Sequence, residues 1–210
     1  MRRMDPDRLT ASSAWLRRIV MLPVLGVLAA CGGAPRPEFS AATAHGSSYP
    51  GITCAPFARE LSGIALYGDA ATWWDSAAGR YRRDSRPVLG AALVFRRESR
   101  LPAGHVSVVS RLVGPRQILV TQANWVAGEL DEDQLVVDVS PANDWTEVRV
   151  WWPPVSQLGA HAYPTFGFIL PPAQATAEEL ARTARIAARI ALTAGTGRPP
   201  PRARQLAGGG

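Results

Sequence analysis

The sequence predicts an α+β domain over about residues 49–172, followed by a further helix. Apolar residues recur at helical spacing in residues 54–65. Beyond them, apolar runs of strand length alternate with turns that contain glycine and proline, as far as Pro171 and Pro172. A second helical pattern occupies residues 173–194. A set of strands with helices before and after it is typical of the α+β class.

The first helix begins with a cysteine, which makes Cys54 a candidate nucleophile. Phe57, Leu61 and Ile64 give residues 54–65 one apolar face, and Pro56 suits a first helical turn. A thiol at this position lies at the positive end of the helix dipole, which favours the thiolate. The alternative is a buried and unreactive thiol.

Histidine is the partner that such a thiol needs, and His105 stands at the start of a predicted strand. Consecutive strands usually pair, and alternation places Gln122 and Asn124 on one side of the next strand. We therefore expect an amide-bearing strand beside His105. His161, in a later loop, is the competing base. The strand-length runs are residues 91–95, 105–110, 117–125, 135–139, 145–152 and 166–170.

Tryptophans near these elements have two interpretations. Trp73 and Trp74 lie in a loop or short helix over residues 67–75, and Trp125 ends the third strand. They either pack against the core or form walls of a substrate cleft.

Four acidic residues after the third strand predict a solvated loop. No calcium-loop spacing or zinc-ligand pattern occurs in the sequence, so we expect no metal and no cofactor. The four residues are Glu129, Asp131, Glu132 and Asp133.

The N-terminal region predicts export. Arg17 and Arg18 precede an apolar run that is too short to span a bilayer and fits a signal peptide over residues 1–30. The end of this run, Leu28-Ala29-Ala30-Cys31-Gly32, resembles a bacterial lipobox, which implies that Cys31 is lipidated. The alternative is an ordinary cleaved signal with a chance cysteine. Residues 31–48 read as a flexible tether.

The resemblance to lipoproteins implies a location. We expect a lipid-anchored protein of the cell envelope that faces the periplasm, and Gly32 resembles the outer-membrane sorting pattern of enteric lipoproteins. A bridge between Cys31 and Cys54 is the alternative use of the two cysteines.

The net charge of +6 is located at the two ends of the chain. Residues 51–172 contain eleven arginines and twelve acidic residues, so the predicted domain is close to neutral. A basic groove for nucleic acid is therefore not expected.

The C-terminal helix starts with a capping box formed by Thr176 and Glu179. Leu180, Ile186 and Ile190 form its apolar stripe, and arginines occupy the other face. The helix either packs on the domain or lies on an acidic surface, and an envelope protein is the partner considered for it. Residues 195–210 are expected to be a disordered tail.

The order of these motifs resembles the CHAP domain, the cysteine, histidine-dependent amidohydrolase/peptidase family. The resemblance covers about residues 49–169. It depends on a cysteine that opens a helix, on Gly104-His105-Val106 at the start of a strand, and on a polar residue two places before Asn124. It implies a papain-like α+β fold in which N-terminal helices pack on an antiparallel sheet of about five or six strands.

The resemblance also implies roles. Cys54 matches the nucleophile, His105 the general base, and Asn124 the residue that orients the imidazole. Many CHAP domains have glutamate where this chain has Gln122, and aspartate where it has Ala91.

The expected function is a cysteine amidohydrolase or endopeptidase that acts on peptidoglycan peptide or amide bonds. The alternative is a lipid-anchored wall-binding module with a degenerate CHAP site. A third interpretation is a structural lipoprotein that recruits a partner through its terminal helix.

Overall fold

The computed structural model describes residues 46–195. The predicted signal peptide, the lipidation site Cys31, most of the tether and the C-terminal tail lie outside these residues. Three α-helices are described: α1 (Cys54–Ser62), α2 (Trp73–Ser76) and α3 (Ala177–Gly195).

The strands of this part of the chain all belong to an antiparallel arrangement. Two-residue strands lie at its margins: β1 (Ser47–Ser48), β2 (Arg83–Asp84) and β8 (Gln157–Leu158). The longer strands are β3 (Ala92–Phe95), β4 (His105–Gly114), β5 (Gln117–Ala123), β6 (Glu129–Asp138), β7 (Glu147–Trp152) and β9 (Tyr163–Ile169).

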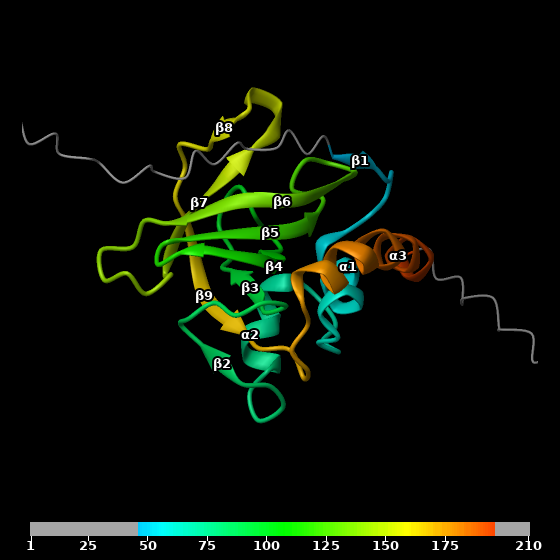
Figure 1. Ribbon diagram of the computed structural model, residues 1–210, viewed down its shortest axis with the longest axis horizontal. Helices are drawn as coiled ribbons and strands as arrows, with labels where there is room; N and C mark the ends of the chain where they lie inside the picture. Colours follow the sequence, from blue (N-terminus) through cyan, green and yellow to red (C-terminus); the bar gives the residue numbers. More distant parts are fainter. Residues whose placement is uncertain (1–45, 196–210) are drawn as a thin grey trace, which may run out of the picture. The chain divides into compact units, whose positions relative to one another are not determined.

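The six longer strands close into a barrel. They pair in the order β6-β5-β4-β3-β9-β7, and a further pairing of β6 with β7 completes the circle (Figure 1). The expected mixture of helices and antiparallel strands is present, but the sequence pattern predicted a sheet and not its closure. The papain-like arrangement stays a prediction.

Two hydrophobic cores result from the alternation of side chains along the strands. Val106 and Val108 pack with α1 in the core that joins the helices to the outer face of the barrel. Val109 belongs to the second core, which lies inside the barrel with Phe95 and Phe168. Because α1 is attached to β4 through the first core, Cys54 at the start of α1 lies near the beginning of β4.

Helix α3 packs beside α1 (Figure 1). The predicted capping box is confirmed: the Glu179 amide donates to Thr176 Oγ1 at 3.2 Å, and the Thr176 amide donates to Glu179 Oε2 at 2.8 Å. The predicted apolar stripe is only partly right, because Leu180 is buried whereas Ile186 and Ile190 are 57% and 41% exposed.

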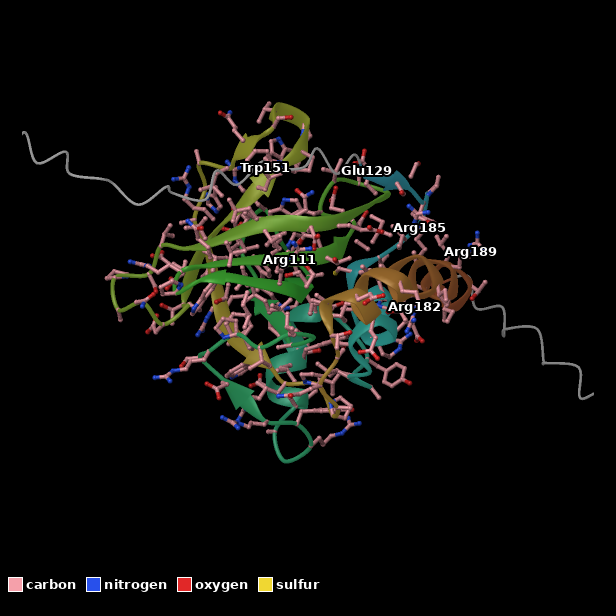
Figure 2. All side chains as sticks on the ribbon, in the orientation of Figure 1. Arg111, Glu129, Trp151, Arg182, Arg185 and Arg189 are labelled. Carbon is pink, nitrogen blue, oxygen red and sulfur yellow. The ribbon has the colours of Figure 1, made fainter. Side chains whose placement is uncertain are left out.

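Small residues make the contact surface of α3. The buried positions that follow Leu180 are all alanines, which let α3 approach the domain closely: Ala184, Ala187, Ala188 and Ala191. Arg182, Arg185 and Arg189 lie on its outer side (Figure 2). None of the helices in residues 46–195 has the length and hydropathy that crossing a membrane requires.

The predicted acidic loop is instead the first half of strand β6. Backbone pairing with β5 and β1 overrides the local polarity. The pairing register with β5 shifts in this half of β6, so Leu130 and Asp131 are both buried, and regular alternation starts only after Asp133. Asp131 is fully buried, whereas Asp133 adopts a positive φ of 53° and accepts a hydrogen bond from Ser110 Oγ at 2.7 Å. The sheet also starts before the predicted domain boundary at Tyr49, since Ser47 and Ser48 pair with β6.

Candidate active site

Cys54 is the first residue of α1, and its sulfur is surrounded by backbone amides. The amide of Val106 lies beside it, together with the amides of Cys54 and Ala55. Burial raises the pKa of the Cys54 thiol, and these amides oppose the rise by stabilising the thiolate. The sequence pattern predicted a thiolate at this helix terminus, but desolvation outweighs the favourable dipoles and keeps the group a thiol.

His105 is the first residue of β4 and is almost completely buried. Its ring Nε2 lies 3.0 Å from Gln122 Oε1. Because a carbonyl oxygen can only accept, Nε2 carries the proton and Nδ1 is left with its lone pair. Burial lowers the pKa of His105 to about 4, although the hydrogen bond with Gln122 acts in the opposite direction. The ring is therefore a neutral imidazole with a fixed tautomer.

Gly104 explains why the chain can place a histidine here. Its φ is +70°, and a Cβ atom at this position would lie 2.6 Å from the Ala71 Cβ and 2.8 Å from the Phe95 carbonyl oxygen. The Ala71 amide also donates to the Ala103 carbonyl at 3.0 Å. The turn before His105 is thus pressed against the 3-10 helix Ala70–Thr72, which fixes the start of β4.

The Cys54 thiol lies at the start of β4, the strand that carries His105, without a direct hydrogen bond to the imidazole. Within residues 46–195 no hydrogen bond joins the Cys54 sulfur to the His105 ring, and the sulfur instead meets the amide of Val106, the residue next to His105. Catalytic hydrogen bonds are often long in unliganded enzymes and shorten when substrate binds. The arrangement fits a neutral thiol and a neutral base that act together once an acyl group is present.

Among residues 46–195 the hydrogen bond to the imidazole comes from Gln122 and not from Asn124, to which the resemblance gave the orienting role. Strand β5 ends at Ala123, and Asn124 turns the chain with a φ of 62°. Its Oδ1 accepts a hydrogen bond from the Gly128 amide at 2.9 Å. The strand was predicted to end at residue 125, two residues later than it does, and of the two amides Gln122 is the one that meets His105.

The three candidate tryptophans have three different positions. Trp73 is fully buried in the helical core, in agreement with the core-packing alternative. Trp74 stacks on Phe166 with a centroid distance of 5.8 Å and contacts Arg83. Trp125 packs against the His105 ring at 5.0 Å, so it screens one side of the imidazole from water.

An aromatic pocket adjoins Trp125 and was not predicted. It consists of two overlapping hollows of about 260 and 220 Å³. Both are lined by Arg100, Trp125, Trp152 and Tyr163. These residues come from four separate segments, and Arg100 and Trp152 read as ordinary strand or turn residues, so no sequence signal joins them.

His161, the competing base, belongs to this pocket and not to the thiol. Its Nε2 lies 3.0 Å from Glu98 Oε2, and its ring packs edge-on against Tyr163 at 4.5 Å. In the part of the chain that the structure describes, no group of three or more histidine, cysteine or acidic side chains could hold a metal ion.

Comparison with known proteins gives one match. The family model of the CHAP domain matches residues 44–124. CHAP domains generally act as amidases or peptidases on peptidoglycan. The match spans less than half of the chain and includes Cys54, His105 and Gln122, whereas β6–β9 and α3 lie beyond it. Neither the curated proteins nor the solved structures gave a match.

Proposed function

We propose that this chain is a cysteine amidohydrolase or endopeptidase that cleaves peptide or amide bonds of peptidoglycan. The observation that supports it most is the meeting of the Cys54 sulfur with the start of β4, where His105 is held by Gln122. The match to the CHAP domain supports both the hydrolase class and the substrate.

In the proposed reaction the Cys54 thiol and the His105 imidazole are both neutral at the start. His105 Nδ1 takes the thiol proton as the Cys54 sulfur attacks the amide carbonyl carbon. The backbone amides around the sulfur are placed to stabilise the negative charge on the carbonyl oxygen. The imidazolium then protonates the leaving amine as the C–N bond breaks, and water hydrolyses the thioester and restores the thiol.

Gln122 is proposed to replace both orienting residues of the family pattern. Its Oε1 fixes the His105 tautomer as the amide of asparagine does in papain-like triads. It supplies no negative charge, so the imidazolium is stabilised less than beside a carboxylate.

The direct test uses isolated peptidoglycan and mass spectrometry of the released fragments. Wild-type protein should produce new fragments, and Cys54→Ala and His105→Gln should not. His161→Gln is the matched comparison for the base, because it removes the competing histidine and should retain kcat. Identical fragments from wild type and Cys54→Ala would refute the hydrolase proposal.

A second candidate is a wall-binding module that has lost turnover. The raised pKa of Cys54 and the pKa of about 4 for His105 favour it, since neither group is charged at neutral pH. In that case Cys54→Ala would bind peptidoglycan as well as wild type does, and neither protein would release fragments.

The location is part of the same proposal. Lipidation of Cys31 would anchor the domain at the periplasmic side of the envelope, beside its substrate, and the outer side of α3 would be available to an envelope protein. A Cys31→Ser variant should lose the lipid mass that the intact protein shows, which mass spectrometry of the purified proteins would measure.

A further inference from the structure

The aromatic pocket beside His105 combines apolar walls with one cation. Trp125, Trp152 and Tyr163 form its walls, and Trp152 is 38% exposed. Arg100 lines both hollows and lies beside the Tyr163 hydroxyl, where its charge opposes the rise in the Tyr163 pKa that burial causes. Arg100 takes part in none of the ion pairs between residues 46 and 195.

The neighbouring acidic group is Glu98, whose Oε2 lies 3.0 Å from His161 Nε2. Among the residues that the structure describes, Glu98 forms no ion pair with Arg100, although its charge also acts on Tyr163. An arginine beside aromatic surface and without its own carboxylate is suited to bind an anionic ligand that also has an apolar part.

The pocket is held in a fixed relation to the proposed base. Glu98 and Leu101 exchange backbone hydrogen bonds of 3.2 and 3.0 Å around Arg100. The Gly104 amide, just before His105, donates to the Leu101 carbonyl at 2.8 Å. Trp125 touches the His105 ring and also lines the pocket. The Trp125 ring therefore lies between a ligand in the pocket and the imidazole, with one face available to each.

The direction of the substrate follows from the chemistry. In the proposed reaction His105 protonates the leaving amine, so the amine-side part of the substrate must pass on the His105 side of the thiol. Trp125 packs on the His105 ring, and the pocket lies beyond Trp125. The hollows of about 260 and 220 Å³ are smaller than the ~300–1,000 Å³ of sites that enclose a whole drug-sized ligand, so they fit a portion of a longer chain.

We infer that this pocket binds the amine-side portion of the substrate and that Arg100 pairs with a free carboxylate on it. The inference depends on the proposed function for its orientation. It assigns a specificity: peptidoglycan stem peptides with free carboxylates should be preferred to stem peptides in which the carboxylates are amidated.

Binding is the first test, because it does not require turnover. The Cys54→Ala protein is titrated with a synthetic stem tetrapeptide, either as the free acid or with its carboxylates amidated, and tryptophan fluorescence is recorded. The free acid should bind about fivefold more tightly, as expected for a partly exposed ion pair. Arg100→Gln should abolish the preference, whereas Arg189→Gln, which removes the same charge from the exposed side of α3, should retain it.

Turnover is the second test. In the active protein, Arg100→Gln should raise KM for the free-acid peptide and leave kcat unchanged, because His105 and Gln122 are not altered. Its activity on the amidated peptide should equal that of wild type, which also shows that the variant folds.

The outcomes separate the two proposals. Equal binding and equal cleavage of both peptides by wild type would overturn the role of Arg100 and leave the hydrolase intact. Selective binding of the free acid without cleavage of either peptide would support the pocket and refute the hydrolase. Loss of activity on the amidated peptide in Arg100→Gln would also contradict the inference, because it would indicate a structural role.

Discussion

Residue 122 determines how much charge the proposed site can hold. The amide of Gln122 fixes the proton on His105 Nε2 but offers no counter-charge to an imidazolium. With the pKa of His105 lowered to about 4 and that of Cys54 raised by burial, the resting pair is neutral at pH 7. A carboxylate in the same place would favour the thiolate–imidazolium pair.

Replacing this amide by a carboxylate should therefore activate the thiol. In Gln122→Glu we expect a higher His105 pKa and a lower Cys54 pKa, and a roughly tenfold faster reaction of Cys54 with iodoacetamide at pH 6. Wild type should react slowly at pH 6 and accelerate only above the pH range in which ordinary thiols ionise, because burial raises the Cys54 pKa. The pH–rate profiles of the two proteins measure this, with Asn124→Asp as the matched control. A Gln122→Glu profile that coincides with that of wild type would mean that His105 does not reach the sulfur.

Two buried groups make stability depend on pH in opposite directions. The pKa of His105 is lowered from 6.5 to about 4, so its contribution is complete above about pH 6.5 and is lost as the pH falls towards 4. The pKa of Asp131 is raised from 3.8 to about 6 by burial and by the nearby Glu129. Its contribution is complete below about pH 3.8 and is lost as the pH rises through 6.

Removing the buried acid should consequently stabilise the protein at neutral pH. Asp131→Asn should increase the free energy of unfolding at pH 8 by up to about 3 kcal/mol, since each pKa unit corresponds to about 1.4 kcal/mol, and should change it little at pH 4. Urea unfolding at the two pH values measures the difference. Glu132→Gln, on the same strand, is the control. An equal effect at both pH values would show that Asp131 does not titrate in this range.

At the scale of elements, the turn before β4 couples folding to the site. Gly104→Ala would bring a Cβ within 2.6 Å of Ala71 and force a left-handed φ of +70° on a residue with a side chain. We expect a loss of about 2–4 kcal/mol in unfolding free energy and a displaced His105. Gly114→Ala is a suitable comparison, because an added Cβ there meets nothing within 4 Å. Thermal unfolding measures the two variants, and equal melting temperatures would contradict the argument.

The packing of α3 gives a second prediction at this scale. Ala184→Leu should destabilise the protein by about 1–3 kcal/mol, because the helix approaches the domain through fully buried alanines. Ile186→Ala should cost about 0.5 kcal/mol or less, because this side chain is 57% exposed. Denaturant midpoints of the two variants give the comparison, and the opposite ranking would restore the isoleucine stripe predicted from the sequence.

Local sequence patterns were sufficient to predict helices and strands. They were not sufficient to predict which side chains from distant segments come into contact. The helix at Cys54, the strand that starts at His105 and the Thr176–Glu179 cap follow from neighbours in the sequence. The position of Asn124 depends on where β5 ends, and the burial of Asp131 depends on pairing with another strand. The Arg100 pocket needs four distant segments, so only the folded chain reveals it.

At the scale of the whole molecule, the family match ends before the barrel is complete. Residues 44–124 contain β3, β4 and β5, whereas β3 also pairs with β9 and β5 pairs with β6. A fragment limited to residues 44–124 should therefore not fold cooperatively, because both outer strands would lose a partner and the inner core would be open to water. Near-ultraviolet circular dichroism of this fragment and of residues 44–195 measures the difference, and a cooperative melt of the shorter fragment would contradict the prediction.

Barrel closure also limits intermolecular aggregation through the β-sheet. Each of the six long strands has a neighbour on both sides, and the strands at the margins, β1, β2 and β8, are only two residues long. Intermolecular sheet growth needs a long strand with unpaired backbone groups that can template another chain. The domain should therefore have little tendency to polymerise through its sheet, because the ring of strands that positions His105 leaves no long strand edge unpaired.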